Sequence, residues 1–198
     1  MPFKIPDVVP AGTFAEQEQP TIAVPGGLVI RPWSPDDAPA VHEAFQDPVI
    51  QRWHAREADS VEEARGWIDG WRQAWSQEND AYWAIADATT DALVGRIALR
   101  LIVFGDGQAE VAYWTMPSAR GRGVAPRALA ALSDWAFDEV GLHRLELTHA
   151  VANEASCRVA FKSGFAPEGT KRSAVLHADG WHDMHLHARV QGDERVRA

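Results

Sequence analysis

A loop that holds two glycines and two arginines constrains the fold of this chain more than any other segment. Arg120-Gly121-Arg122-Gly123 lies between a strand-like stretch at 110–115 and a helix-like stretch at 126–140. Glycine admits backbone conformations, and close approaches of a ligand, that a side chain prevents. The helix after the loop directs its unpaired N–H groups and the positive end of its dipole into the loop. This arrangement predicts an anion site suited to a pyrophosphate.

The loop differs from the two commonest phosphate-binding motifs. It ends in Gly123-Val124-Ala125, where a Walker loop ends in Gly-Lys-Ser/Thr. A dinucleotide fingerprint needs a third glycine and an early βαβ unit, but this loop begins after residue 119. A tight turn with surface arginines and a nucleotide-dependent enzyme are the alternatives. Pro126 and the apolar residues that follow at helical spacing favour a binding loop, because they mark a helix start directly after the glycines.

The composition fits one ordinary globular domain. A chain of 198 residues, 46% hydrophobic and 24% charged, is long enough for one full core and short for two. No apolar run approaches the length that crosses a bilayer, and no secretory signal is visible at the N-terminus. Cys157 is the only cysteine, which excludes an internal disulfide and fits a reducing compartment. We therefore expect a cytoplasmic protein with no membrane partner.

The charge and the histidines argue against two classes of ligand. A formal net charge of −9 disfavours nucleic acid, because phosphate binding needs clustered Lys and Arg. An acidic surface would instead attract cationic amines. His177, His182, His185 and His187 lack the helical spacing or cysteine partners of a zinc site, so we predict no metal. If 183–190 is a strand, His185 and His187 share one face.

The proline and glycine pattern divides the chain into an arm, a domain and a tail. Residues 1–27 are rich in Pro and Gly and show neither helical nor strand periodicity, which predicts an extended arm. The arm carries too many apolar side chains for a solvated tail, so we expect a homodimer in which the arm lies on its own domain or crosses to the second subunit. A monomer with the arm on its own domain is the alternative. Residues 28–190 form the single domain, and 191–198 are predicted to be a frayed tail.

Alternation and helical spacing predict up to seven strands and four helices, an α/β (α+β) domain. The predicted strands are 28–33, 82–87, 93–104, 109–115, 144–149, 166–176 and 183–189, and the predicted helices start at Ser34 or span 60–76, 126–140 and 154–163. The stripe Trp67, Trp71 and Trp75 favours core packing. A pocket wall that includes some of these rings and Trp53 is the alternative. The segments 46–60, 76–82 and 172–182 are predicted loops that carry no motif for substrate choice.

Two motifs resemble one known family. Arg120-x-x-Gly123-x-Ala125 resembles the Gln/Arg-x-x-Gly-x-Gly/Ala loop that holds the pyrophosphate of acetyl-coenzyme A (acetyl-CoA) in the GCN5-related N-acetyltransferases (GNATs). Asn153-x-x-Ser156 is similar to the Asn-x-x-Ser segment of that family, above all in the branch of the ribosomal-protein N-terminal acetyltransferases. Both motifs stand in the family's order and at its spacing, which makes the resemblance specific.

The resemblance continues to the end of the domain and implies a fold. Gly164-Phe165 matches the Gly-Phe that follows Asn-x-x-Ser, and Glu168-Gly169 with Gly180-Trp181 resembles the closing hairpin of the ribosomal-protein branch. The similarity covers residues 28–190. It implies the GNAT fold: a central mixed, mostly antiparallel twisted sheet of six to seven strands, flanked by about four helices. In this fold, splayed central strands form the cofactor cleft.

The resemblance also implies an activity. GNAT enzymes move an acetyl group from acetyl-CoA to a primary amine, on a protein N-terminus or a small molecule, by direct transfer in a ternary complex. An acyl-CoA-binding module with weak or no catalysis is one alternative. An acyltransferase that uses a larger donor such as succinyl-CoA is another. The acceptor amine cannot be chosen from the sequence.

The implied contacts with the donor fall on the loop, the strand before it and one later helix. The pantetheine arm would pair with the backbone of a splayed strand, for which Trp114, Thr115 and Met116 are our candidates. Asn153 is also suited to cap the helix that begins at Glu154. The implied cofactor-binding residues are Trp114, Thr115, Met116, Arg120, Gly121, Arg122, Gly123, Val124, Ala125, Asn153, Ser156 and Phe161.

Proton transfer is the least specified part of the implied mechanism. The amine must lose a proton, and the thiolate must be stabilised as it leaves. Ser156 stands where the ribosomal-protein branch carries a serine that assists the thiolate, whereas Ala160 stands where many relatives carry an acidic tyrosine. Glu110 is our candidate base, because it shares a strand face with apolar residues that do not explain it. His149 and a water relay are its rivals.

Overall fold

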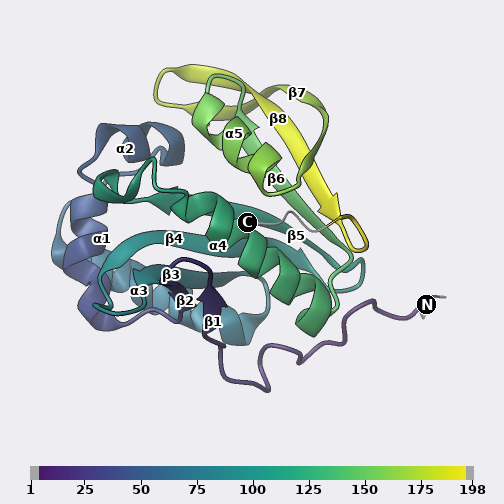
Figure 1. Ribbon diagram of the computed structural model, residues 1–198. Coiled ribbons are helices and arrows are strands. Elements are labelled where there is room, and N and C mark those ends of the chain that lie inside the picture. The colour runs from purple at the N-terminus through teal and green to yellow at the C-terminus, as the bar shows by residue number, and fades with distance from the viewer. Residues whose placement is uncertain (1–4, 195–198) are drawn as a thin grey trace.

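One sheet runs through the whole domain. The computed structural model describes residues 5–194, and this part contains an eight-stranded sheet of order β1-β2-β3-β4-β5-β6-β8-β7 (Figure 1). Neighbouring strands are antiparallel except for β5 and β6. The strands are β1 (Ile22–Val24), β2 (Leu28–Arg31), β3 (Ala81–Asp87), β4 (Leu93–Val103), β5 (Gln108–Thr115), β6 (Arg144–Ala150), β7 (Ala166–His177) and β8 (Gly180–Val190).

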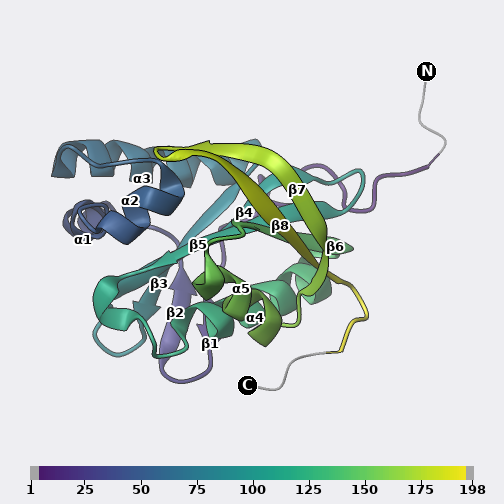
Figure 2. The same cartoon turned by 90° about the horizontal axis from the view of Figure 1, so that it is seen from above.

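Helices cover both faces of the sheet, three on one face and two on the other (Figure 2). The first group is α1 (Ala38–Ala44), α2 (Pro48–His54) and α3 (Val61–Gln77), and the second is α4 (Val124–Trp135) and α5 (Glu154–Lys162). Short 3-10 turns stand at Pro35–Asp37 and Pro117–Ala119, and a π turn at Ala136–Val140 continues α4. In the described residues, no helix combines the length and the apolar character needed to span a membrane.

Capping side chains fix where the first helices begin. Ser34 Oγ accepts from the Asp36 N–H and Ser60 Oγ from the Glu63 N–H, each satisfying a donor that has no partner inside its helix. In a capping box Glu63 would reach back to the Ser60 N–H, but it accepts from the Asp59 N–H instead, at 2.8 Å. The helix starts predicted at 34 and 60 are therefore confirmed, with one changed partner.

The predicted fold is confirmed, and the structure adds one strand and one helix. The eighth strand is β1, which lies inside the segment predicted as an extended arm and pairs with β2 through three residues. Three residues between proline and glycine are too few to show a period of two, so the pattern did not reveal it. The added helix is α2, in a segment predicted as a loop, where Asp47 caps the start and Pro48 occupies the first turn.

The arm closes one end of the core. Phe14 is buried and stacks on Trp75 of α3 at 4.2 Å between ring centroids, and it also lies 6.1 Å from the Trp135 ring of α4. Those two helices cover opposite faces of the sheet, so the phenyl ring stands where both layers meet. Trp71 and Trp75 are buried, which confirms that the tryptophan stripe of α3 serves the core. Burying one such ring stabilises the fold by about 2 kcal/mol.

The single parallel pair positions the site. β5 and β6 are paired only from Gln108 with Arg144 to Glu110 with Glu146. Beyond Glu110, β5 continues to pair with β4, and β6 continues to pair with β8. The two strands therefore splay apart, as predicted, and one edge of each faces a gap inside the sheet.

Glu78 ties the arm to the end of α3. Its carboxylate accepts three backbone N–H groups of the arm, from Gly12 at 2.8 Å, Phe14 at 2.7 Å and Ala15 at 3.1 Å. Burial alone would raise the pKa of Glu78, but these three hydrogen bonds lower it below the ordinary 4.5. Their stabilising contribution is complete above the ordinary pKa and is lost as the pH falls through the lowered pKa of the folded state.

We expect Glu78→Gln to lower the free energy of unfolding at neutral pH by about 1–2 kcal/mol, because hydrogen bonds to a charged acceptor become bonds to a neutral one. The difference should begin to shrink below the ordinary pKa of 4.5, where the unfolded chain is protonated, and be lost as the pH falls through the lowered pKa of folded Glu78. Urea denaturation followed by tryptophan fluorescence at several pH values measures this. Glu16→Gln, an exposed carboxylate on the same arm, is the control. A pH-independent difference would contradict the assignment.

Candidate functional site

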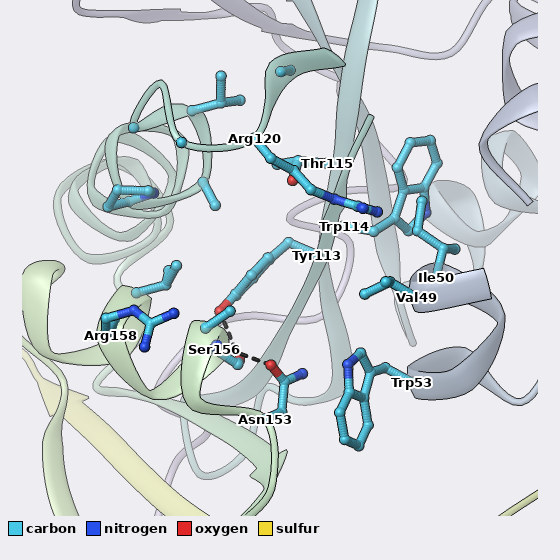
Figure 3. A pocket seen from close by; sticks show the side chains of 18 of the residues that line it. Val49, Ile50, Trp53, Tyr113, Trp114, Thr115, Arg120, Asn153, Ser156 and Arg158 are labelled. Atoms are coloured by element: carbon cyan, nitrogen blue, oxygen red, sulfur yellow. Dashed lines mark hydrogen bonds between the residues drawn. The ribbon is translucent and has the colours of Figure 1, made fainter. Parts of the chain in front are cut away.

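Two cavities meet at the gap between β5 and β6. The first, of about 480 Å³, lies between the glycine loop, α2 and α5 (Figure 3). The second, of about 340 Å³, lies among β4, β5, β6 and β7 and includes Glu110 in its wall. Both cavities are lined by the same five residues where they adjoin: Trp53, His54, Tyr113, Asn153 and Ser156. They therefore form one cleft with two arms and a common centre.

The glycine loop offers unpaired backbone donors to the first cavity. Gly121 and Gly123 have φ of 75° and 71°, in the left-handed region that favours glycine. Gly123 is the N-cap of α4 and has no side chain to cap the helix, so the N–H groups of Val124 and Ala125 face the cavity without an intrahelical partner. A Cβ added at Gly121 would meet nothing within 4 Å. The loop thus has the donors, the helix dipole and the open space of an anion site.

Arg127 and Arg120 make different contacts at the loop. Arg127 folds back, with Nε donating to the Gly123 carbonyl at 3.0 Å and Nη2 to the Arg122 carbonyl at 3.0 Å, so it supports the loop from outside. Arg120 lines the first cavity and forms an ion pair with Asp47 at 2.5 Å. The hydrogen bond from Arg120 is the main cause that lowers the pKa of Asp47.

Asp47 joins the glycine loop to α2. The same carboxylate that binds Arg120 also accepts from the N–H groups of Val49 and Ile50 in the first turn of the helix. This arrangement holds α2 against the loop, and α2 supplies Trp53 and His54 to the common centre. Trp53 was among the rings considered for a pocket wall, whereas sequence reasoning missed His54 and the helix, although Asp47-Pro48 carries a readable helix-start signal.

Backbone hydrogen bonding along β5 indicates which of its backbone groups face the gap. The Met116 N–H donates to the Val94 carbonyl of β4 at 2.9 Å, and its carbonyl accepts from the Ala119 N–H. Antiparallel pairs alternate, so Trp114 turns its backbone toward β4 as well, while Tyr113 and Thr115 turn theirs toward the gap. Of the three residues predicted to pair with a pantetheine arm, the geometry favours Thr115 and adds Tyr113.

Tyr113 and Ser156 form the centre of the cleft. Their hydroxyl oxygens lie 2.8 Å apart, and Asn153 Oδ1 accepts from the Ser156 N–H at 3.1 Å, capping α5 (Figure 3). Burial raises the pKa of Tyr113 to about 12, so its phenol keeps its proton at neutral pH. A phenol thus stands beside Ser156 although α5 carries Ala160 in place of the family's tyrosine. Sequence reasoning did not single out Tyr113, because strand alternation gives its face but not its partner.

The second cavity holds one carboxylate among several cations. Glu110 Oε2 accepts from Thr148 Oγ1 at 3.0 Å, across the point where β5 and β6 part. Arg96, Arg100 and Lys171 line the same cavity. Burial, with a smaller effect of the Arg96 and Arg100 charges, lowers the pKa of His54 to about 3, so its imidazole is neutral at pH 7. Glu110 is therefore the anionic group that an amine entering this arm would meet.

His149 is less suited to that role. Its Nδ1 lies 2.8 Å from the Ala150 carbonyl and its Nε2 lies 3.2 Å from Nε2 of His187, so both ring nitrogens face protein atoms. Burial also lowers the pKa of His149. The geometry favours Glu110 over His149 as the group that faces an acceptor.

Most of the predicted site residues converge on the cleft, and three do not line it. Met116, Arg122 and Phe161 belong to neither cavity wall; Phe161 is 56% exposed and contacts the His187 ring edge-on. Lys162 and Arg158 of α5 line the first cavity and were not predicted. The residues that the structure does bring to the cleft are Glu110, Trp114, Thr115, Arg120, Gly121, Gly123, Val124, Ala125, Asn153 and Ser156.

Comparisons with known proteins agree with this geometry. A family model described as acetyltransferase (GNAT) domain matches residues 27–166. The uncharacterized N-acetyltransferase YoaA of Bacillus subtilis is 25% identical over 168 residues, 84% of this chain and 95% of that protein. The ribosomal-protein-serine acetyltransferase of Escherichia coli is 33% identical over 100 residues, 50% of this chain and 56% of that protein. The structure of Mycobacterium smegmatis RimJ in complex with CoA-disulfide superimposes with a TM-score of 0.80 at 25% identity, covering 89% of this chain and 91% of that one.

Proposed function

Because this chain belongs to the acetyltransferase (GNAT) domain family and resembles its ribosomal-protein branch, we propose that it transfers an acetyl group from acetyl-CoA to a primary amine. The observation that carries the proposal is the meeting of two cavities at Tyr113 and Ser156. A donor in one arm and an acceptor in the other would come into contact only at that centre. The acceptor is a protein N-terminus or a small-molecule amine.

The first cavity fits the pyrophosphate and pantetheine parts of a coenzyme A. The N–H groups of Val124 and Ala125 and the dipole of α4 supply anion binding. The free backbone edge at Tyr113 and Thr115 supplies donors and acceptors for an extended amide chain. Lys162 and Arg158 add positive charge at the same wall. The RimJ neighbour was solved with a CoA-disulfide, which supports this assignment.

The centre of the cleft supplies the proton chemistry. Acetyl-CoA brings the activated acyl group, and the residues of this chain position it and move protons. Glu110, held by Thr148, removes a proton from the incoming amine directly or through water. Ser156 donates a hydrogen bond to the departing sulfur, and the protonated phenol of Tyr113 supports it from behind.

Two other functions are consistent with the same cavities. An acyl-CoA-binding module with weak or no catalysis would keep the first cavity, and a succinyl-CoA-dependent enzyme would use the cations of the second. Thiol release measured with acetyl-CoA, succinyl-CoA and a panel of amines distinguishes them. We place the protein in the cytoplasm, in keeping with a single cysteine and with ribosomal-protein acetyltransferase relatives.

We expect Gly123→Asp to abolish binding of coenzyme A, because the new side chain puts an anion where the pyrophosphate would lie. Calorimetric titration with coenzyme A measures the loss. Gly27→Asp is the matched control: it has nearly the same positive φ, 74° against 71°, and open space, but it lies in the turn between β1 and β2. Equal affinity of the two variants would overturn the binding site.

We expect Glu110→Gln to reduce the transfer rate about a hundredfold and to flatten the low-pH limb of the rate profile, because the amine loses its proton acceptor. Ser156→Ala should cost about tenfold to a hundredfold in rate, since one hydrogen bond to the sulfur is lost. Steady-state kinetics with acetyl-CoA at several pH values test both. Wild-type rates in both variants would contradict these roles of Glu110 and Ser156. Catalysis would then rest on substrate positioning and on water.

We also propose that the protein forms a homodimer and that the arm is part of the interface. The described arm residues lie on their own domain, with the Val8 N–H donating to the Gly105 carbonyl. Val8 is 49% exposed there, and Leu101 and Val103 of β4 are 62% and 48% exposed. Light scattering should give a dimeric mass for the full chain, and Leu101→Lys should give a monomer. A monomeric wild-type protein at micromolar concentration would contradict the dimer.

A further inference from the structure

Four potential metal ligands meet beneath α5, and one of them, His149, also lines the second cavity. His149 comes from β6, His185 and His187 come from β8, and Cys157 comes from α5. One ligand atom from each lies within 4.8 Å of every other. His149 and His185 are cross-strand partners, and His187 is two residues farther along β8, so all three imidazoles share one face. We call these four residues the His/Cys cluster.

Hydrogen bonds fix the tautomers of two members of the cluster. Nδ1 of His149 lies 2.8 Å from the Ala150 carbonyl, and Nδ1 of His187 lies 3.4 Å from the Phe165 carbonyl. A carbonyl only accepts, so each Nδ1 carries the hydrogen. In the neutral rings both Nε2 atoms then present lone pairs, and these two atoms face each other at 3.2 Å. Two buried lone pairs at that separation repel unless a proton or a metal ion stands between them.

The donor set and its spacing identify the cation. We propose that the His/Cys cluster binds one zinc-type divalent metal ion through His149 Nε2, His187 Nε2, the His185 imidazole and the Cys157 sulfur. Tetrahedral zinc with three nitrogens and one sulfur separates its ligand atoms by about 3.3–3.6 Å. The observed 3.2 Å between the two Nε2 atoms is close to that value, and the other ligand atoms lie within 4.8 Å. The carbonyls of Ala150 and Phe165 serve as the outer partners that orient metal-bound histidines.

Binding also changes the protonation of the cysteine. The thiol of Cys157 releases its proton to solvent as the sulfur–metal bond forms, and the three imidazoles bind in their neutral form. The sequence pattern did not reveal this site, because its ligands come from two strands and a helix rather than from one spaced motif. The metal would hold α5 to β6 and β8. Ser156 and the cap Asn153 lie on that helix, so the ion has a positioning role in the cleft rather than contact with substrate.

The test uses the full-length protein stripped with a chelator and titrated with Zn²⁺ and, separately, Co²⁺. We expect one ion per chain with a dissociation constant on the order of a micromolar or tighter. Bound Co²⁺ should show the sulfur-to-metal charge-transfer band of a cysteine ligand. Cys157→Ser should remove that band, and Cys157→Ser and His185→Ala should each weaken Zn²⁺ binding at least about a hundredfold. Circular dichroism and binding of coenzyme A check that the variants fold.

His182→Ala is the matched control, because His177, Asp179 and His182 form a second histidine group on the β7–β8 turn. The Asp179 carboxylate of that group already has partners: it accepts from Arg52 and bonds His182 at 2.7 Å. Wild-type Zn²⁺ affinity in His182→Ala, with loss in Cys157→Ser, supports the His/Cys cluster. The reverse pattern, or no ion bound to the wild-type protein, overturns it.

A second inference, which rests on the proposed function, concerns the acceptor. Arg96 in the wall of the second cavity is 7% exposed, and its Nε has no hydrogen-bond partner among the described residues. Its guanidinium lies 5.2 Å from the ring of Trp71 and 5.5 Å from that of Tyr82. The nearby Asp80 is committed to the Tyr82 hydroxyl and the Leu101 N–H. Aromatic faces alone leave this buried cation without an anion.

The geometry points to an acceptor that carries a carboxylate as well as its amine. The amine would lie near Glu110 and the carboxylate near Arg96; Arg100 shares the strand face of Arg96 and lies directly opposite Glu110. A guanidinium binds a carboxylate with two parallel hydrogen bonds, which satisfies the buried donors and orients the acceptor. The whole chain carries a net charge of −9, yet this cavity is cationic. The charges that line the cavity, rather than the net charge, therefore determine which acceptor binds.

Peptide amides that differ only by Asp or Asn at the second or third position test this inference. We expect wild-type kcat/KM to favour the Asp peptides at least about tenfold, because only they satisfy the guanidinium. Arg96→Met should abolish the preference, and Arg72→Met, an exposed arginine of α3, should keep it. Calorimetry with the same peptides in the presence of coenzyme A gives a second readout that needs no transfer. Equal binding of Asp and Asn peptides contradicts the carboxylate assignment alone, whereas selective binding without thiol release contradicts the proposed transfer.

Discussion

Parallel pairing between β5 and β6 ends after three residue pairs, and this early end determines where anything can bind. Both strands remain anchored on their outer sides, β5 to β4 and β6 to β8, so the sheet does not fall apart. The edges that part are left with backbone groups inside the domain, and such groups require partners. An extended amide chain is a suitable partner, since it presents the same donors and acceptors as a strand. The separated edges of β5 and β6 therefore form a binding site through their backbone groups alone.

Side chains then divide the gap into two chemically different arms. The glycine loop, with the exposed start of α4, makes one arm a site for anions. The other arm combines one carboxylate, Glu110, with the guanidinium groups of Arg96 and Arg100. The hydroxyls of Tyr113 and Ser156 stand between them, 2.8 Å apart. Because burial keeps the phenol protonated, the centre offers hydrogen-bond donors rather than a negative charge to a departing thiolate.

Local rules made the glycine loop and the cap at Asn153 predictable from sequence. Left-handed glycines before a helix and an Asn that caps the next helix each follow from a few consecutive residues, and the structure has both. The bond between Asp47 and Arg120 spans 73 residues, and the one between Tyr113 and Ser156 spans 43. No local pattern encodes such pairings, because they exist only after the sheet has brought the segments together. The start signal of α2, Asp47-Pro48, is local and was present, so predicting that segment as a loop was a misreading of the sequence.

The fifth helix connects the centre of the cleft to the His/Cys cluster through adjacent residues. Consecutive positions on a helix point about 100° apart, so Ser156 faces Tyr113 while Cys157 turns toward the histidines of β6 and β8. A shift of α5 therefore changes both contacts at once. Without an ion, the facing lone pairs of His149 and His187 push against the packing that holds the helix down. With an ion bound to Cys157, the helix is fixed to β6 and β8 at the turn that carries the serine. In the mechanism proposed above, the position of the Ser156 hydroxyl would then depend on a group that never touches the substrate.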